Sequence, residues 1–139
     1  MKAPIQVLLA EDNPDDALLL KEALADTRID HVLTTVSDGT EVLAYLAGEA
    51  PFESTQKPDI LFLDLNMPKM GGLDVLQELN KRGVSKIPIV VLTVSNDKEE
   101  ILQALKLRMN YYIRKPVDDS QLKPLLSLIS DMWYPQEAS

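Results

Sequence analysis

Short apolar runs alternate with longer amphipathic stretches along the chain. Each run has the length of a β-strand, and the nearly uninterrupted apolar character of the first, third and fourth runs is typical of a strand buried on both faces of a sheet. The five predicted strands cover residues 5–10, 31–36, 59–64, 88–93 and 111–114.

Apolar residues recur at helical spacing between and after these strands. Helices are predicted over residues 15–27, 40–47 and 73–82, after a cap at Asn96 or Asp97, and from Ser120 onward. Gly83 is expected to end the third helix. Pro124 lacks an amide donor, so we expect a separate tight turn at the start of the last helix. The residues expected to face inward are Leu18, Leu19, Leu20, Ala23 and Leu24, then Val42, Leu43 and Leu46, then Val75, Leu76 and Leu79, and finally Leu122, Leu125, Leu126, Ile129, Met132 and Trp133.

Strands and helices that alternate in this way predict an α/β fold with right-handed crossovers and a doubly wound parallel sheet. The common strand order for a small sheet of this kind is 2-1-3-4-5. A chain of 139 residues fits one domain, and a hydrophobic content of 45% is enough for one core. We therefore expect a single domain over residues 1–139.

Four of the predicted strands end in polar side chains. Glu11 and Asp12 follow the first strand, Asp64 ends the third, Thr93 ends the fourth and Lys115 follows the fifth. The carboxyl ends of parallel strands line the ligand crevice of an open sheet, so these side chains are expected to meet in one site. Each residue alone has an ordinary explanation, because acids cap helices and most lysines are solvated, but their joint position favours a functional site.

The acids of this predicted site favour a hard divalent cation. Three carboxylates in one crevice repel one another, and oxygen ligands that share a phosphate suit magnesium, with manganese as an alternative. Lys115 offers a point charge and Thr93 a hydroxyl donor for phosphoryl oxygens. Asp64 can then act as the nucleophile and form an aspartyl phosphate.

The composition narrows the classes of partner. A formal net charge of -8 disfavours nucleic acid and anionic membrane surfaces, which attract clustered lysines and arginines. The chain has no cysteine, which excludes disulfides and zinc thiolate sites. No signal peptide or membrane-spanning run is visible, so the cytoplasm is the expected compartment.

The polar strand ends belong to a longer ordered pattern that resembles the receiver domains of two-component response regulators over essentially the whole chain. The matching residues are Glu11-Asp12, Asp64 with Met67-Pro68 and Gly71, Thr93, and Lys115-Pro116. The resemblance implies a flavodoxin-like fold in which Asp64 accepts a phosphoryl group from the phosphohistidine of a kinase.

The same resemblance assigns roles around Asp64. It implies that the metal is held by Glu11, Asp12, Asp64 and the backbone carbonyl of Asn66. It implies that Thr93 and Lys115 contact the phosphoryl group, that Tyr112 is a switch aromatic, and that the Lys115–Pro116 bond is cis. For Tyr112, a half-buried strand tyrosine is the ordinary alternative.

Three features of the chain resemble the single-domain receivers that are partnered with bacterial phytochrome histidine kinases. They are the opening Glu-Asp-Asn-Pro-Asp-Asp, the long loop over residues 48–58 and the aromatic end at Trp133. The resemblance implies a sensor histidine kinase as partner. The chain ends soon after the last predicted helix, so we expect no output domain. The signal is then expected to pass by binding to another protein, by phosphotransfer or by quenching a kinase, rather than by enzyme turnover. Members often dimerise through the fourth helix, fifth strand and fifth helix, where Trp133 serves either the interface or the core.

Two departures from the pattern lie near the predicted site. Val94 follows Thr93 where the family usually has a smaller residue, and it is expected to narrow access to Asp64. Arg108-Met109 replaces a Gly-Ala pair that is common before the fifth strand, which is expected to reshape the surface of the fourth helix.

Three alternative functions remain open from the sequence. A magnesium-dependent phosphatase of the haloacid dehalogenase type also uses a strand-end aspartate, but it needs a second acid where this chain has Asn66. A flavin-binding module needs a phosphate loop after the first strand, where this chain is acidic. A receiver that serves only as an unphosphorylated scaffold is the third.

Overall fold

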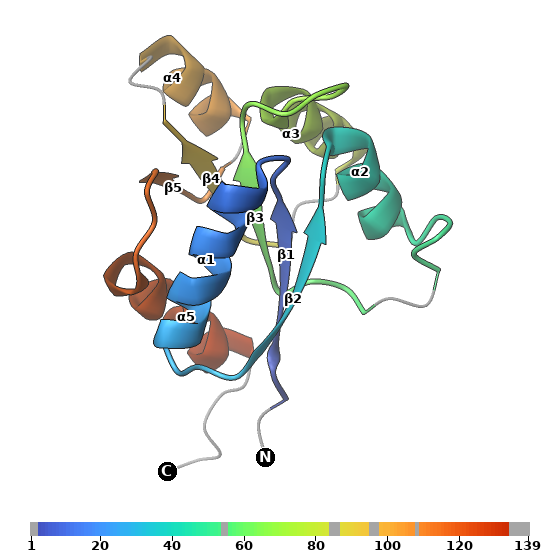
Figure 1. Cartoon of the computed structure of the whole chain (residues 1–139). Coiled ribbons are helices and arrows are strands. Elements are labelled where there is room, and N and C mark those ends of the chain that lie inside the picture. Colours follow the sequence, from blue (N-terminus) through green and yellow to red (C-terminus); the bar gives the residue numbers. More distant parts are fainter. Residues whose placement is uncertain (1–2, 54–55, 84–86, 95–97, 108, 134–139) are drawn as a thin grey trace.

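The predicted doubly wound sheet is present in a computed structural model that describes residues 3–53, 56–83, 87–94, 98–107 and 109–133. Figure 1 shows strands and helices alternating along the whole described chain. The elements are β1 Ile5–Ala10, α1 Pro14–Asp26, β2 His31–Val36, α2 Gly39–Ala47, β3 Ile60–Asp64, α3 Gly72–Arg82, β4 Ile89–Thr93, α4 Lys98–Lys106, β5 Tyr111–Arg114 and α5 Asp119–Trp133.

The sheet has the strand order β2-β1-β3-β4-β5, and its pairings are parallel, which confirms the expected topology. Because the strands run in the same direction, their carboxyl ends lie at one edge of the sheet, at the top in Figure 1. The register aligns Asp64 at the end of β3 with Leu92 in β4, and Thr93 at the end of β4 with Arg114 in β5.

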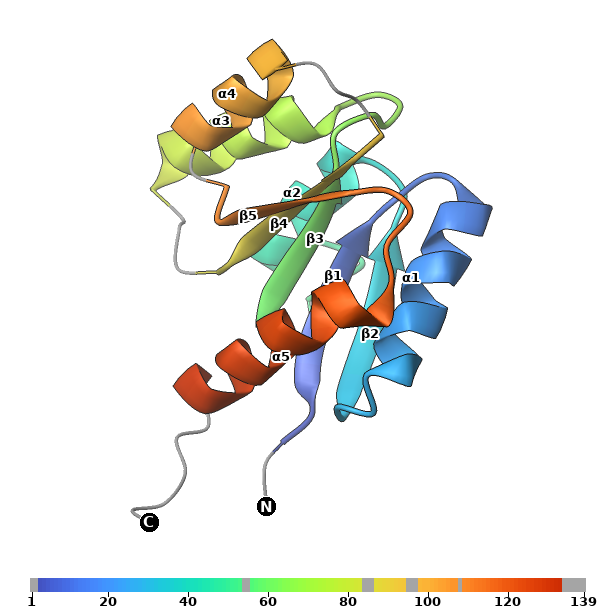
Figure 2. The same cartoon turned by 90° about the vertical axis from the view of Figure 1, so that its left-hand side faces the viewer.

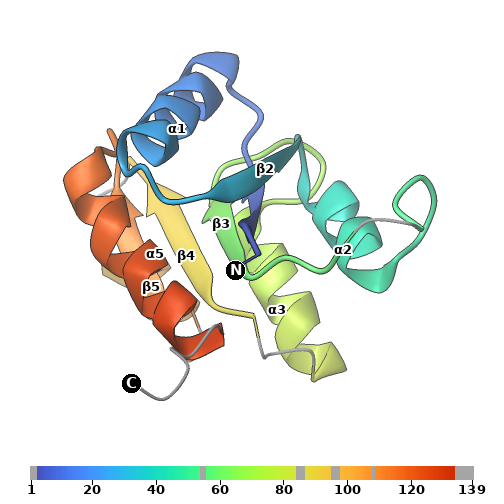
Figure 3. The same cartoon turned by 90° about the horizontal axis from the view of Figure 1, so that it is seen from below.

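Helices cover both faces of the sheet, so the central strands β1, β3 and β4 are buried between two apolar layers, whereas the edge strands β2 and β5 are partly exposed. Helices α1 and α5 lie on one face, and α2, α3 and α4 lie on the other (Figures 2 and 3). Successive strand residues alternate between the layers: Leu8 packs in the layer of α2 and α3, while Val7 and Leu9 pack in the layer of α1 and α5. Both layers are closed to solvent, as expected for a parallel sheet.

Local side-chain chemistry sets the helix ends. Asn13 caps α1, because its Oδ1 accepts hydrogen bonds from the backbone amides of Asp15 at 2.9 Å and Asp16 at 3.2 Å. Pro14 occupies the first helical position, where a missing amide donor is harmless. Gly83 ends α3 in the left-handed conformation with φ of 70°, as predicted.

The structure corrects the predicted apolar face of α1 and extends that of α2. Leu18 and Leu19 of α1 were expected to face inward, but their exposed fractions are 52% and 45%, and only Leu20, Ala23 and Leu24 are buried. In α2, Val42 is buried as expected, and Tyr45 is buried as well, although the sequence pattern had not assigned it to the core.

The last helix does not begin with a separate turn. Helix α5 is continuous from Asp119 through Pro124, so the predicted break is wrong. Asp118 caps it: its Oδ1 accepts from the amides of Ser120 and Gln121, and Gln121 accepts from the amide of Asp118 in return. This reciprocal cap holds the first turn together ahead of the proline.

Some predictions concern parts of the chain outside the described residues. These are the cap at Asn96 or Asp97 and the role of Arg108; the side chains of Ile129, Met132 and Trp133 also lie outside what the structure describes. Within the described residues, none of the helices combines the length and apolar character needed to cross a membrane.

Candidate functional site

The carboxyl edge of the sheet brings the predicted polar residues together. Glu11 follows β1 directly and its amide donates to the carbonyl of Val36 at 3.0 Å. Lys115 follows β5 and its amide donates to the carbonyl of Thr93 at 2.9 Å. Continued parallel pairing beyond the strand ends therefore brings the acids and the ammonium group together, as the sequence predicted, and Thr93 ends the strand between β3 and β5.

Three carboxylates form the centre of the site. One carboxylate oxygen from each of Glu11, Asp12 and Asp64 can be chosen so that the three atoms lie within 4.8 Å of one another. Glu11 and Asp64 are buried, whereas Asp12 is exposed, so the cluster opens toward solvent on the Asp12 side. A set of hard oxygen donors at this spacing, with an open side for water and substrate, fits magnesium or manganese.

The loop after β3 contacts the same cluster. The backbone amide of Asn66 donates to Oδ1 of Asp64 at 3.1 Å, which fixes that carboxylate oxygen. Asn66 is exposed, and its side chain is an amide, so the position two residues after Asp64 carries no acid. This residue type provides no proton donor for a phosphatase leaving group.

Lys115 joins the cluster through three ion pairs. Its Nζ lies 2.5 Å from Oε1 of Glu11, 3.0 Å from Oδ2 of Asp16 and 3.2 Å from Oδ2 of Asp64. The exposed fraction of the Lys115 side chain is only 11%, so these carboxylates take the place of water around the ammonium group.

Asp16 is the member of this network that the sequence analysis missed. It lies in the first turn of α1, where an acid is already explained by the positive end of the helix dipole. The available signal was its position five residues after Glu11, at the start of a helix that begins directly beyond the acid pair.

Burial and charge shift the protonation of this network. Burial is the main cause that raises the pKa of Glu11 from 4.5 to about 7; a hydrogen bond with Asp64 adds to the rise and Lys115 opposes it. Burial by itself lowers the pKa of Lys115, but its pairs with Glu11, Asp16 and Asp64 outweigh that effect and hold the pKa above its ordinary value. Lys115 is therefore a cation throughout the neutral range.

The remaining predicted residues lie around this centre. Thr93 is fully buried at the end of β4, and the side chain of Val94 beside it is 62% exposed. Tyr112 is partly buried against the apolar layer of α2 and α3. The Lys115–Pro116 peptide bond is cis, as predicted.

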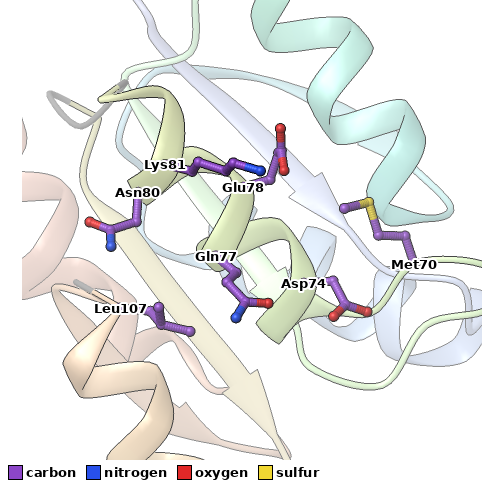
Figure 4. Close-up of a pocket in the computed structure, with 7 residues that line it drawn as sticks. All are labelled: Met70, Asp74, Gln77, Glu78, Asn80, Lys81 and Leu107. Atoms are coloured by element: carbon purple, nitrogen blue, oxygen red, sulfur yellow. The ribbon is translucent and has the colours of Figure 1, made fainter.

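A groove elsewhere on the molecule is a different kind of surface. It lies between α3 and the end of α4, has a volume of about 630 Å³, and is drawn in Figure 4. Its lining combines Asp74 and Lys81 with the apolar side chains of Met70 and Leu107. It contains neither the carboxylate cluster nor Lys115, so it is not part of the candidate site.

Comparison with known proteins places the fold and the cluster in a family. Residues 7–127 match the model of the response regulator receiver domain. The chain is 33% identical to response regulator Rcp1 of Synechocystis sp. PCC 6803 over 131 residues, which cover 94% of this chain and 89% of that protein.

Solved structures agree with this match. The phosphorylated cyanobacterial phytochrome response regulator RcpA aligns with a TM-score of 0.79 and 36% identity, covering 98% of both chains. The Mn²⁺-bound form of Rcp1 aligns with a TM-score of 0.76 and 32% identity, covering 97% of this chain and 98% of that chain. On the strength of its matched length, its strand order and the acids and lysine at its sheet edge, the chain belongs to the response regulator receiver domain family.

Proposed function

We propose that this chain, a single receiver domain over residues 1–139, accepts a phosphoryl group on Asp64 from the phosphohistidine of a sensor histidine kinase. The observation that carries the proposal is the convergence of Asp64 with Glu11, Asp12 and Lys115 at the carboxyl edge of the sheet. Glu11 and Asp64 are both buried members of the cluster and both pair with Lys115. Of these two, Asp64 ends β3 itself, the position that matches the phosphoacceptor of the family.

The proposed metal ligands are Glu11, Asp12, Asp64 and the backbone carbonyl of Asn66. The donor chemistry of the described carboxylates supports this set, and manganese in the related Rcp1 structure supports the kind of ion. When bound, a divalent cation supplies positive charge that neutralises part of the negative charge on the carboxylates and on the incoming phosphoryl oxygens.

The chain's own residues account for the transfer step. An Oδ atom of Asp64 attacks the phosphorus, the P–N bond of the donor breaks, and the bonding pair stays on the imidazole nitrogen, which takes up a proton. Lys115 already lies 3.2 Å from Oδ2 of Asp64, so its ammonium group is placed to pair with a phosphoryl oxygen as negative charge moves outward.

The proposed response uses the neighbouring strand ends. The hydroxyl of Thr93 donates a hydrogen bond to the phosphoryl group. Tyr112, one strand away, turns further inward as the loop after β4 shifts. A change from mostly inactive to mostly active requires about 5.5 kcal/mol of differential interaction. A phosphoryl group, with its added charge and strong acceptor oxygens in a buried site, is a suitable source of that energy.

The proposed partner is a phytochrome-type histidine kinase, because several of the similar solved structures are described as phytochrome or bacteriophytochrome response regulators. Output then passes to an effector protein or a phosphotransfer protein. We also propose self-association through α4, β5 and α5, where Leu105, Tyr111 and Leu128 expose 53%, 51% and 58% of their surface.

Phosphorylation of Asp64 is tested with Asp64→Asn. We expect loss of phosphoryl transfer from a phosphorylated histidine kinase and a retained fold, because asparagine keeps the shape but is a poor nucleophile. The measurement is intact-protein mass spectrometry together with circular dichroism. Asp74→Asn, which replaces an acid of α3 outside the carboxylate cluster, serves as the matched control and should be phosphorylated normally.

Phosphorylation of Asp64→Asn at the wild-type level would reject the assignment. Sustained release of phosphate from a generic phosphomonoester by the wild-type protein would instead favour a phosphatase.

A further inference from the structure

We propose that Asp38 and Gly39, at the start of α2, position the loop of residues 65–71 and, through it, the metal-binding carbonyl of Asn66. We call these seven residues the β3–α3 loop. The assignment rests on the proposed function, because it concerns the cation that the acid cluster would hold.

One end of the β3–α3 loop is fixed by the strands. The amide of Leu65 donates to the carbonyl of Leu92 in β4 at 3.2 Å, and the amide of Gly72 donates to the carbonyl of Leu65 at 3.1 Å. A Cβ atom on Gly72 would lie 2.6 Å from the carbonyl oxygen of Asp64, so the backbone of α3 approaches Asp64 as closely as glycine allows. These contacts fix the residue before Asn66.

The other end of the loop makes a tight turn that is unfavourable by itself. Lys69 has φ of 63°, in the left-handed region that costs a non-glycine residue about 1 kcal/mol or more. The amide of Met70 donates to the carbonyl of Pro68 at 2.6 Å across this turn. A strained turn of this kind persists where its surroundings hold it.

Gly39 is the residue that holds the turn from outside. Its amide donates to the carbonyl of Met70 at 2.9 Å. A Cβ atom on Gly39 would lie 2.6 Å from that carbonyl oxygen and 2.8 Å from Cγ of Met70. Figure 4 shows the Met70 side chain directed toward α2. Any larger residue at position 39 must therefore displace the loop or the start of α2.

Asp38 fixes the direction in which Gly39 points. It is buried, with an exposed fraction of 6%, and its Oδ1 accepts from the hydroxyl of Thr40 and from the amide of Glu41 at 3.0 Å. Its Oδ2 lies 3.8 Å from Nζ of Lys69, on the loop itself. Asp38 thus caps α2 and faces the strained turn at the same time.

These contacts connect the start of α2 to the metal site through the β3–α3 loop. If Asn66 binds the cation only when the turn at Lys69 is in place, then metal binding and the Gly39–Met70 hydrogen bond must stabilise each other. The coupling has to be visible from both ends: a change at Gly39 alters metal affinity, and metal alters the opening of the Gly39 hydrogen bond.

The first experiment measures magnesium affinity by titration calorimetry for Gly39→Ala and for Gly48→Ala. Gly48 follows the same helix with φ of 69°, and a Cβ atom built on it would meet nothing within 4 Å, so its substitution introduces strain without touching the loop. We expect Gly39→Ala to bind magnesium about tenfold more weakly, a change of about 1.4 kcal/mol, and Gly48→Ala to bind as the wild type does.

The second experiment uses the wild-type protein without substitution and does not depend on any measurement of activity. Amide hydrogen exchange of the wild-type protein is followed by NMR with and without magnesium. We expect the ion to slow exchange at Gly39 several-fold more than at Val42, whose amide donates to the carbonyl of Asp38 in the same turn but not to the loop.

The outcomes separate this assignment from the function on which it rests. Wild-type magnesium affinity in Gly39→Ala, equal weakening in Gly48→Ala, or equal slowing at Gly39 and Val42 would each overturn the positioning role. Absence of magnesium binding by the wild-type protein would overturn the proposed function and this assignment together.

Discussion

The ammonium group of Lys115 contacts carboxylates that would also hold the proposed divalent cation. In the structure, Nζ of Lys115 contacts Glu11 and Asp64, two of the three carboxylates in the proposed metal set. Two cations this close repel each other by several kcal/mol at the effective dielectric of a protein surface, before solvent screening. In the proposed function, Lys115 is therefore expected to favour a phosphoryl group in the site and to weaken the binding of a metal ion.

A substitution of Lys115 tests this opposition. We expect Lys115→Met to bind magnesium about tenfold more tightly than the wild type, equivalent to about 1.4 kcal/mol. The measurement is titration calorimetry at a pH well above the pKa of Glu11, so that proton competition is small. Arg114→Met removes the same charge from the neighbouring exposed position and should change the affinity little. Weaker magnesium binding by Lys115→Met would show that the lysine organises the carboxylates instead of competing for them.

The sequence predicted these residues with unequal success, for a physical reason. Glu11, Asp64, Thr93 and Lys115 lie at strand ends, and parallel strands deliver their ends to one edge whatever the details of packing. Asp16 lies on a helix, and its approach to Lys115 depends on the tilt and rotation of α1 against the sheet. Sequence spacing alone does not specify that geometry.

At the scale of elements, strands were easier to predict than helix faces. The continuous apolar runs of β3 and β4 are buried along their whole length, so no choice of face was needed. In α1, three successive leucines spread around the helix, and only Leu20 reaches the core. The apolar stripe alone did not indicate which leucine that would be, because packing in the layer shared with α5 decides it.

Helix α5 contains a residue whose replacement should strengthen it. Pro124 is exposed and lies inside the helix, where it cannot donate to the carbonyl four residues earlier. We expect Pro124→Ala to raise the free energy of unfolding by about 1–3 kcal/mol, measured by urea denaturation. Lys123→Ala, an exposed neighbour of ordinary helix propensity, should remain within about 0.5 kcal/mol of the wild type. A loss of stability in Pro124→Ala would mean that the ring makes packing contacts that outweigh the missing hydrogen bond.

At the scale of the whole molecule, the regular alternation of strands and helices was sufficient for the topology. Crossover connections between parallel strands have one favoured hand, so few arrangements of five strands were compatible with the pattern. The order β2-β1-β3-β4-β5 is one of those few. The start of α5 was not predictable in the same way, because the apolar pattern does not show that Asp118 and Gln121 cap the first turn ahead of Pro124.

The stability of the whole domain should depend on the protonation of Glu11. Its pKa of about 7 in the folded protein exceeds the value of 4.5 expected in the unfolded chain, so the folded state binds an extra proton between these values. Without divalent ions, the stabilisation is complete below pH 4.5 and is lost as pH rises through about 7, by up to about 3 kcal/mol.

Urea denaturation across this pH range, in the presence of a chelator, measures the effect. Glu11→Gln should remove most of the slope, because the neutral amide has no proton to lose. A wild-type free energy of unfolding that stays level or rises between these pH values would contradict the assignment.

The two apolar layers on either side of the sheet have a consequence for how such a domain can diversify. Among the described residues, the buried side chains form two separate clusters, one on each face of the sheet, so replacements on opposite faces should act nearly independently. New recognition surfaces can then arise on the α1–α5 side, away from Asp16 at the start of α1, while the packing beneath α2 and α3, which supports the β3–α3 loop, is preserved. Such a domain can come to contact different proteins while its carboxylate cluster and Lys115 stay unchanged.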